Sequence, residues 1–448
     1  MKKTIRHQAV DILNRVATSR AFAGELLDIQ LDEQSLSGTA DGRLLTHLVY
    51  GVLRMQGHLD WILAGLCRGG YDKMEENVKN ILRSGLYQLE FSDRLPAFAV
   101  VDEAVKIAKR INPGAGGLVN AVLRSHLRNT NKTIFPSAEK NTAEYIAAFY
   151  SHPLWLVEQW LDFFGREETT ALCHANNEVP PPTVRVNTLK ISRSTLEEHL
   201  KSQDFNCAPT PFSPDGINLL DPPLPIQKTL FFQEGLLRLQ DEAAQLVSHL
   251  ASPQSGKNIL DVCSGSGGKT SHLAALMKNQ GRIVALDRDT EKLAQLNKDA
   301  SRQGISIIET MQADLTCPLP ALLTGQFDVV LVDAPCSGTG TLRRNPEIKW
   351  RLKSSDISAH AKLQKTILQN AATAVQKNGR LIYCTCSLLP SENDHVILGF
   401  LAGYPQFTVE PVSPPVLQTF VDRYGFFRTY PHRYPMDGFF GAVFRRRN

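Results

Sequence analysis

The stretch that decides the fold is N-I-L-D-V-C-S-G-S-G-G-K-T, residues 258–270. A short apolar run ends at Asp261, a glycine-rich turn follows, and the helical pattern K-T-S-H-L-A-A-L-M begins at Lys269. A strand that leads through a glycine turn into a helix is typical of the first unit of a doubly wound α/β domain. Glycine in such a turn lets a ligand approach the backbone closely. The stretch therefore predicts a ligand-binding α/β domain.

This glycine turn does not match two common phosphate-binding patterns. A Walker A loop, G-x-x-x-x-G-K-T, would need glycine at position 263, which is Cys263. The dinucleotide pattern G-x-G-x-x-G would need glycine where the chain has Thr270. The turn thus argues against a P-loop NTPase and against a dehydrogenase. It favours a nucleoside ligand of another kind.

Downstream of the turn, short apolar or β-branched runs alternate with helical patterns. The runs are R-I-V-A-L-D, I-I-E-T-M-Q-A-D, F-D-V-V-L-V-D-A-P and R-L-I-Y-C. Alternating strands and helices with nearly continuous apolar strands indicate a parallel, Rossmann-like α/β sheet, which we assign to residues 251–448. Ligands of such sheets bind at the carboxyl ends of the strands.

Three carboxylates end successive runs of this predicted sheet: Asp287, Asp314 and Asp333. Any one of them could be an ordinary turn residue, but three at successive strand ends beside a glycine loop favour a binding site. Asp287 lies where an acidic residue would accept hydrogen bonds from ribose hydroxyls. S-adenosylmethionine fits this pattern, because its adenosine needs ribose and ring contacts and no phosphate cradle.

Upstream of the α/β pattern, residues 1–130 are predicted to form an all-α helix bundle. The run L-L-T-H-L-V-Y-G-V-L, residues 44–53, places its apolar residues on one helical face, and R-L-P and I-N-P-G-A-G-G separate such runs. A polar linker is predicted at 131–145. Helical patterns mixed with proline-rich loops predict a small α+β module at 146–250. The chain is therefore expected to be multidomain.

Composition limits the class of protein. The chain has 448 residues, which allows two or three domains, and a net charge of +4, which excludes a histone-like polycation. The N-terminus M-K-K-T-I-R-H-Q-A-V lacks the apolar stretch of a signal peptide, and no run is long enough to span a membrane. Eight cysteines without a C-x-x-C pair favour a reduced cytoplasmic protein with no membrane partner.

Two cysteines follow predicted strand ends in a way that suggests chemistry. Cys336 lies in D-A-P-C-S-G-T-G, where amino-group methyltransferases often carry an aromatic residue that stacks on a base, and Cys386 lies in Y-C-T-C-S. A thiol stacks poorly, but it can attack carbon. A thiolate that adds to C6 of a pyrimidine makes C5 nucleophilic enough to take the sulfonium methyl group. Asp333 is placed to hydrogen-bond N3 of such a base.

Other roles for the cysteines were weighed against this one. A metal site at Cys384 and Cys386 would need two further clustered ligands, and nearby His395 alone is not enough, so no metal is expected. Cys384 is interpreted as a substitute for a small residue. The remaining cysteines outside the glycine turn are interpreted as buried or surface fillers: Cys67, Cys173, Cys207 and Cys317.

Taken together, the motifs D-V-C-S-G-S-G-G-K-T, D-A-P-C-S-G-T-G and Y-C-T-C-S-L-L-P-S-E-N resemble the RNA 5-methylcytosine methyltransferase family. The helical N-terminal region, P-T-V-R-V-N-T, L-Q-D-E-A-A-Q, R-R-N-P-E-I-K-W and the closing D-G-F-F resemble its bacterial 16S rRNA members. In those proteins the N-terminal bundle is similar to the RNA-binding antiterminator NusB. The resemblance covers essentially the whole chain. It implies methylation of C5 of a cytosine in 16S rRNA, with S-adenosylmethionine as cofactor.

The resemblance also implies roles for single residues. Cys386 would be the nucleophile, Cys336 would help to resolve the adduct and release product, and Asp333 would contact N3 of the base. The residues assigned to S-adenosylmethionine are Cys263, Ser264, Gly265, Ser266, Gly267, Gly268, Lys269, Asp287, Asp314 and Asp333. The family loop usually has the sequence C-A-A-P-G-G-K, so Ser266 replaces a proline, which should loosen the loop. Lys269 could touch the ligand or cap local structure.

The target base must be unpaired or flipped out, since C6 is inaccessible in a stack. The expected partner is 16S rRNA, naked or in an early small-subunit particle, and the protein is expected to be a monomer. Alternatives are another RNA such as tRNA, a DNA cytosine-C5 enzyme with Cys336 as nucleophile, and a non-catalytic ribosome assembly factor. Arg185 and Asn187 could line the RNA path or belong to a strand edge.

Overall fold

The computed structural model describes residues 3–19, 21–67, 70–92, 95–129 and 134–447. Residues 130 and 131–133, at the predicted boundary of bundle and linker, lie outside the described residues. The chain forms two compact units. Unit 1 contains Met1–Val179 together with Leu342–Arg351, and unit 2 contains Pro180–Thr341 together with Leu352–Asn448.

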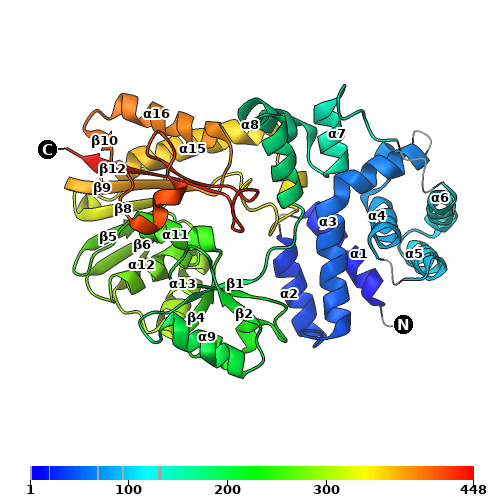
Figure 1. Cartoon of the computed structure of the whole chain (residues 1–448), viewed down its shortest axis with the longest axis horizontal. Coiled ribbons are helices and arrows are strands. Elements are labelled where there is room, and N and C mark those ends of the chain that lie inside the picture. Colours follow the sequence, from blue (N-terminus) through cyan, green and yellow to red (C-terminus); the bar gives the residue numbers. More distant parts are fainter. Residues whose placement is uncertain (1–2, 20, 68–69, 93–94, 130–133, 448) are drawn as a thin grey trace. The chain divides into compact units, whose positions relative to one another are not determined.

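Unit 1 is helical throughout its described residues, as the apolar periodicity predicts (Figure 1). Its helix α7 begins within the predicted linker, 131–145, and its helix α8 falls in the range 146–250 that was assigned to the α+β module. Pro96 precedes the first turn of α5, where a missing N–H costs nothing. The helices are α1 (Ile5–Thr18), α2 (Ala23–Glu33), α3 (Ala40–Leu66), α4 (Glu76–Phe91), α5 (Ala97–Ile111), α6 (Gly116–Arg128), α7 (Thr142–Phe149), α8 (Leu154–Ala175) and the short α14 (Ile348–Arg351).

The predicted apolar face of residues 44–53 lies on α3 and is buried in the core of unit 1. Leu45, Leu48, Val49 and Val52 are fully buried, and Leu44 packs against the same cluster. In an α-helix, residues three or four positions apart lie on the same face, and here that face packs against the neighbouring helices. This part of the prediction is therefore confirmed.

Residues 342–351 belong to unit 1 although they follow a strand of unit 2 in sequence. The ammonium group of Lys349, whose side chain is 1% exposed, donates to three acceptors. They are the carbonyl oxygens of Arg54 and Ser151, each at 2.8 Å, and Oδ1 of Asn177 at 3.1 Å. Burial, and then the charge of Arg54, lower the pKa of Lys349 well below its usual value. The three acceptors offset the cost of burying this polar group. Lys349 thus anchors this segment in unit 1.

Unit 2 begins with the small α+β module that the sequence predicts. Four short antiparallel strands have the order β2-β3-β1-β4. Helix α11 follows β4 and leads toward the larger sheet. The strands are β1 (Thr183–Val186), β2 (Cys207–Pro209), β3 (Gly216–Leu219) and β4 (Leu237–Leu239), and the helices are α9 (Arg193–Ser202), α10 (Leu230–Gln233) and α11 (Glu242–Leu250).

The larger sheet of unit 2 has the order β10-β12-β9-β8-β5-β6-β7, with β11 paired to β12. The five predicted strands, β5 to β9, run parallel. The antiparallel strands β10, β11 and β12 were not predicted, and antiparallel edges on otherwise parallel sheets are common. The strands are β5 (Asn258–Asp261), β6 (Arg282–Asp287), β7 (Ile308–Gln312), β8 (Phe327–Asp333), β9 (Val375–Thr385), β10 (Phe407–Val409), β11 (Phe427–Thr429) and β12 (Phe439–Arg446).

Helices cover both faces of this sheet. Figure 1 shows α15 (Ser354–Ala372) and α16 (Asp394–Gly403) on one face, and α12 (Gly268–Leu276) and α13 (Thr290–Gln303) on the other. Neighbouring residues of β5 join different cores, because successive side chains of a strand point to opposite faces: Leu260 packs with α15 and α16, and Ile259 packs with α12. This double burial explains the continuous apolar runs of the sequence.

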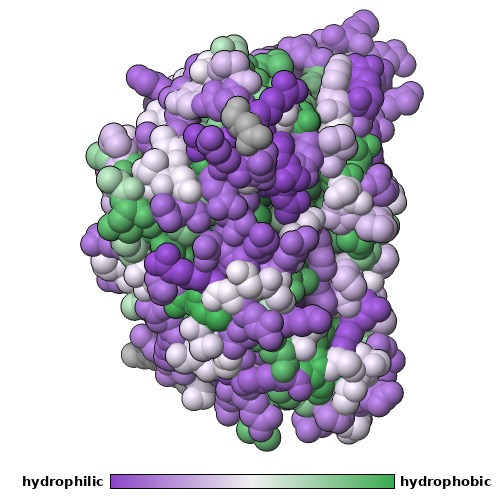
Figure 2. All heavy atoms as spheres, turned by 90° about the vertical axis from the view of Figure 1, so that its left-hand side faces the viewer, coloured by the Kyte–Doolittle hydropathy of each residue, from purple (hydrophilic) through white to green (hydrophobic). Residues whose placement is uncertain are grey.

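The surface agrees with the ordinary composition of the chain. No helix among the described residues is long and apolar enough to cross a membrane. The side of the molecule that lies on the left in Figure 1 is mostly hydrophilic, with small, scattered apolar areas (Figure 2).

We expect Lys349→Met to destabilise the full-length protein by about 3 kcal/mol, because it removes the donor for three acceptors buried in unit 1. Urea unfolding, followed by circular dichroism, measures the change. Lys362→Met, on an exposed position of α15, is the matched control and should change stability by less than about 0.5 kcal/mol. Equal effects of the two substitutions would contradict the anchoring role of Lys349.

Candidate active site

The structure brings Cys336 and Cys386 together, with their sulfur atoms 3.2 Å apart. Strands β8 and β9 are parallel neighbours in which Asp333 pairs with Cys384, so the residues that follow the two strand ends meet at one edge of the sheet. Both thiols are half-buried. Two candidate nucleophiles that are fifty positions apart in the chain are therefore in direct contact at the carboxyl ends of β8 and β9.

A buried carboxylate joins the two loops that carry these thiols. Glu392 has no exposed surface, and its oxygens accept hydrogen bonds from the backbone N–H of Ser337 at 2.9 Å and from the hydroxyl of Ser387 at 2.5 Å. It also accepts from the Ser337 hydroxyl and, at 3.0 Å, from Gln364. Ser337 follows one thiol and Ser387 follows the other. Sequence reasoning quoted S-E-N in its motif but gave Glu392 no role.

Gly340 lets the two loops approach each other. Its N–H donates to the carbonyl oxygen of Cys386 at 2.8 Å. A Cβ atom at this position would lie 2.0 Å from the carbonyl oxygen of Gly438, which no side chain can tolerate. The last glycine of D-A-P-C-S-G-T-G is thus required by backbone packing.

Asp333, at the end of β8, is held between two groups. One carboxylate oxygen accepts from the ammonium of Lys269 at 2.5 Å, and the other accepts from the thiol of Cys384 at 3.4 Å. Burial alone would lower the pKa of Lys269, but the charge of Asp333 outweighs it and raises that pKa, so the lysine is a cation. Lys269 therefore has a structural role, because it is paired with Asp333, in addition to any contact that it makes with a ligand.

The thiols differ in their surroundings. Burial, and then the charge of Asp333, raise the pKa of Cys384 well above its usual value, so this thiol is neutral and a poor nucleophile. The hydrogen bond with Cys386, followed by burial, raises the pKa of Cys336 in the same direction. Cys336 is thus a protonated thiol beside Cys386, and it can donate a hydrogen bond to the neighbouring sulfur.

The glycine loop connects β5 to α12 and leaves open space. Gly265 and Gly267 have positive φ angles of 52° and 83°, which side chains rarely adopt. A Cβ atom at Gly265 would have no atom within 4 Å, whereas one at Gly267 would lie 2.5 Å from Leu296. The loop is fixed at its base, because both the N–H and the hydroxyl of Ser264 donate to the carbonyl of Leu286.

Ser266, which stands where the family loop usually has proline, has a partner that the sequence did not indicate. The guanidinium of Arg238 donates to its carbonyl oxygen at 3.0 Å and to its hydroxyl at 3.3 Å. Arg238 is in turn paired with Asp299 on α13. Arg238, which lies outside the glycine loop, thus holds Ser266 in position.

The remaining predicted carboxylates also lie at strand ends. Asp287 accepts from the N–H of Gly265 on one oxygen and from the N–H of Asp289 on the other, both at 2.9 Å. A carboxylate has further lone pairs, so it can still accept from ligand hydroxyls. Asp314 follows β7, is exposed, and has a pKa that hydrogen bonds from Thr316 lower. These positions bring Asp287 to the glycine loop and leave Asp314 open to solvent.

Arg185 and Asn187 do not line a surface for RNA. Both are buried, with exposed fractions of 1% and 2%. Arg185 donates to the carbonyl oxygen of Gly268 at 2.7 Å and to the Ser271 hydroxyl at 2.9 Å. It therefore supports the first turn of α12.

These features fit a nucleoside ligand at the carboxyl ends of β5 and β6. The open space at Gly265 leaves room for it, and Asp287 offers carboxylate lone pairs for ribose hydroxyls. A parallel α/β sheet with such a loop is the Rossmann-like architecture that S-adenosylmethionine-dependent methyltransferases share with other nucleotide-binding proteins. S-adenosylmethionine is the cofactor, and it supplies an electrophilic methyl group when bound.

Comparisons with known proteins narrow the class to one family. The family model described as 16S rRNA methyltransferase RsmB/F matches residues 248–445. The NusB family model matches residues 3–128, and the model of the RsmF/B-like ferredoxin-like domain matches residues 152–227. A probable ribosomal RNA small subunit methyltransferase B of Bacillus subtilis is 35% identical over 453 residues, with 100% of both chains covered.

A further relative is the ribosomal RNA small subunit methyltransferase B of Pseudomonas syringae, which is 35% identical and covers 89% of this chain and 86% of its own. Among solved structures, that of PH0851 superimposes with a TM-score of 0.85 at 26% identity and covers 100% of both chains. A methyltransferase homolog protein from Pyrococcus horikoshii has a TM-score of 0.59 at 27% identity, over 68% of this chain and 99% of its own. The chain belongs to the ribosomal RNA small subunit methyltransferase B family.

The buried Asp261, at the end of β5, should make stability depend on pH. Burial, the largest effect, raises its pKa from 3.8 to about 7 despite a hydrogen bond from Thr270. Since the folded-state pKa is the higher one, the contribution of the protonated form is complete below pH 3.8 and is lost as pH rises through about 7. Asp261→Asn, which keeps an acceptor, removes this loss.

We therefore expect the free energy of unfolding of Asp261→Asn, relative to wild type, to be higher at about pH 8 than at about pH 5. Urea titrations at the two pH values measure it. Asp328→Asn is the control, because hydrogen bonds lower the pKa of Asp328 against its burial, so its titration falls below this window. A difference that is the same for Asp261→Asn at both pH values would contradict the prediction.

Proposed function

We propose that this protein methylates C5 of an unpaired cytosine in 16S rRNA, through a covalent bond between the sulfur of Cys386 and C6 of the base. The observation that carries the proposal is the 3.2 Å separation of the two thiols at the ends of β8 and β9. The names of the relatives support small-subunit ribosomal RNA as the substrate. The NusB-like domain supports RNA as the partner.

In the proposed reaction the thiolate of Cys386 forms a bond to C6, which places electron density on C5 and on N3. C5 then takes the methyl group, a base removes the C5 proton, and the C6–S bond breaks with its electron pair returning to sulfur. Cys336 retains its proton and lies 3.2 Å from the departing sulfur. A hydrogen bond from Cys336 to the thiolate makes it a better leaving group, so Cys336 promotes product release.

Asp333 is the proposed contact to N3 of the base. As C6 is attacked, N3 takes up a proton from water and returns it when the C6–S bond breaks. While N3 is protonated, its N–H donates a hydrogen bond to the Asp333 carboxylate. Lys269 fixes this carboxylate at 2.5 Å. Lys269 is therefore a positioning residue, in addition to any contact that it makes with the cofactor.

The proposed cofactor residues are those of the glycine loop, Cys263 to Lys269, together with Asp287, Asp314 and Asp333. We expect Asp287→Asn to weaken S-adenosylmethionine binding by about tenfold or more, since a charged acceptor for ribose hydroxyls is lost. Isothermal titration calorimetry measures the affinity. Asp289→Asn, at the N-cap of α13 where asparagine caps equally well, is the control and should bind the cofactor normally. Unchanged affinity of Asp287→Asn would remove Asp287 from the site.

The two thiols should be separable by mutation. We expect Cys386→Ala to abolish methyl transfer and trapping by RNA that contains 5-fluorocytosine. We expect Cys336→Ala to accumulate a covalent RNA adduct, because the departing sulfur loses its hydrogen-bond donor. Denaturing gels detect the adduct, and bisulfite sequencing of small-subunit rRNA from cells with and without this gene locates the methylated cytosine. Cys317→Ala, an exposed thiol, is the control with normal activity.

Each alternative has its own outcome in this experiment. Normal turnover by Cys386→Ala, together with loss of adduct in Cys336→Ala, would favour Cys336 as the nucleophile. No methyl transfer by the wild-type protein to any rRNA, naked or in a particle, would favour a ribosome assembly factor.

A further inference from the structure

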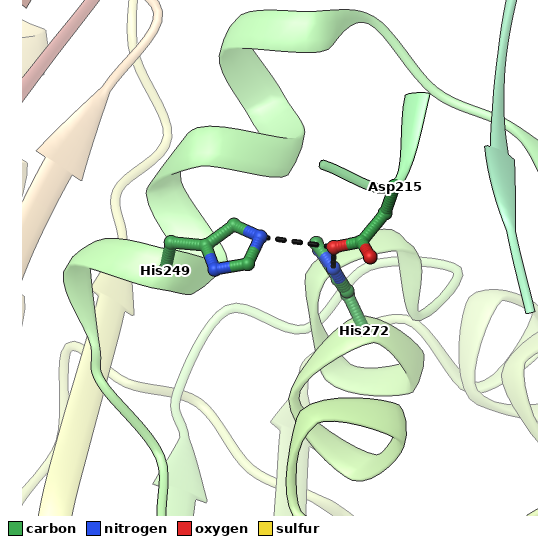
Figure 3. Close-up of side chains that lie close together, drawn as sticks. All are labelled: Asp215, His249 and His272. Atoms are coloured by element: carbon green, nitrogen blue, oxygen red, sulfur yellow. Dashed lines mark hydrogen bonds and ion pairs between the residues drawn. The ribbon is translucent and has the colours of Figure 1, made fainter. Parts of the chain in front are cut away.

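Three side chains of unit 2 that the proposed reaction does not use meet at one point: Asp215, His249 and His272, here called the His–Asp–His cluster. The Nε2 atoms of His249 and His272 lie 2.9 Å and 3.0 Å from the same carboxylate oxygen, Oδ2 of Asp215. One ligand atom from each residue lies within 4.8 Å of the others. Figure 3 shows both rings pointing from their helices to this carboxylate.

Well-ordered elements hold the three side chains. Asp215 directly precedes β3, and its carbonyl oxygen accepts from the N–H of Val186 on β1 at 2.8 Å. His249 lies near the end of α11 and His272 lies within α12, and the two helices share one apolar core. The cluster is therefore set in place by packing before any ligand arrives, which lowers the entropic cost of binding.

The donor atoms of the cluster suit a metal ion. Imidazole nitrogen and carboxylate oxygen are both ligands of metal ions in proteins. Two nitrogens and one oxygen suit zinc better than magnesium or calcium, which prefer oxygen ligands.

We propose that the His–Asp–His cluster binds a zinc ion through Nε2 of His249, Nε2 of His272 and Oδ2 of Asp215. Bond lengths of about 2.0–2.2 Å in tetrahedral geometry separate neighbouring ligands by roughly 3.3 Å. The two nitrogen–oxygen spacings of 2.9 Å and 3.0 Å therefore need to widen by a few tenths of an ångström, and the two nitrogens lie within 4.8 Å of each other. In the metal complex Nε2 of each ring binds the ion and the ring proton is on Nδ1, so no further co-reactant is needed. His249 has 16% of its side chain exposed, which leaves a path for the ion and a water ligand.

Such an ion would tie α11 and the strand module to α12, the helix that begins at the cofactor loop. The open fourth position and the nearby charge of Arg185 make the site weaker than a closed four-ligand site. A metal was considered in the sequence only at Cys384 and Cys386. The members of the cluster are 34 and 57 positions apart, so no spacing motif marks them.

The test uses the full-length protein after dialysis against a chelator. Titration with zinc chloride should bind about one ion per chain and raise the melting temperature, and cobalt(II) should give the visible absorption of a tetrahedral site. Asp215→Asn and His249→Gln should each lower zinc affinity by more than about tenfold while the circular dichroism spectrum stays unchanged. The control His395→Gln, an exposed histidine outside the cluster, should bind zinc as the wild type does.

Two results would overturn the proposal. One is absence of zinc binding by the wild-type protein, which would leave the cluster as a hydrogen-bonded structural group. The other is zinc held by the thiol pair, which Cys386→Ala would abolish and His249→Gln would leave intact. Since binding is measured without RNA or S-adenosylmethionine, either result is independent of the proposed methyl transfer.

Discussion

The buried carboxylate of Glu392 is the constraint on which the arrangement of the active site depends. A carboxyl group without solvent contact is costly, and here the cost is offset by donors from Ser337, Ser387 and Gln364. Ser337 directly follows Cys336, and Ser387 directly follows Cys386. By accepting from both serines, Glu392 holds the two cysteine loops next to each other. A longer or shorter side chain at position 392 would therefore be expected to change the distance between the sulfur atoms of Cys336 and Cys386.

Helix α12 is the second organising element of unit 2. Its N-terminal residue Gly268 accepts from the buried Arg185, Lys269 in its first turn is paired with Asp333, and His272 one turn later bonds to Asp215. The helix thus has polar ties to the strand module, to the end of β8 and to α11 through the cluster. The proposed cofactor loop, the proposed base contact Asp333 and the candidate metal site all adjoin one short helix, so a shift of α12 would affect each of them.

Unit 1 has a comparable buried polar group in Lys349. Lys349 belongs to residues 342–351, which interrupt the sequence of unit 2 but are part of unit 1. Its ammonium group donates to backbone carbonyl oxygens of unit 1. Nothing in the periodicity of R-R-N-P-E-I-K-W indicates this, since a segment with four charged residues in eight would usually lie at the surface. The motif is instead an anchor whose three acceptors lie far away in the chain.

The sequence alone determined the helical face of residues 44–53, the five parallel strands and the glycine loop, and it singled out Cys336 and Cys386 as a pair. These features are local, because apolar periodicity, glycine spacing and the position of a residue at a strand end are all visible within about ten residues. Only the tertiary structure decided that the two sulfur atoms lie 3.2 Å apart, that Glu392 and Arg238 support the loops, and that Asp215 meets two histidines. It also decided that Arg185 is buried and that β12 pairs antiparallel with β9. Those contacts join residues that are tens of positions apart in the chain. Hydrogen bonds over such separations produce no repeating pattern that could be recognised in the sequence.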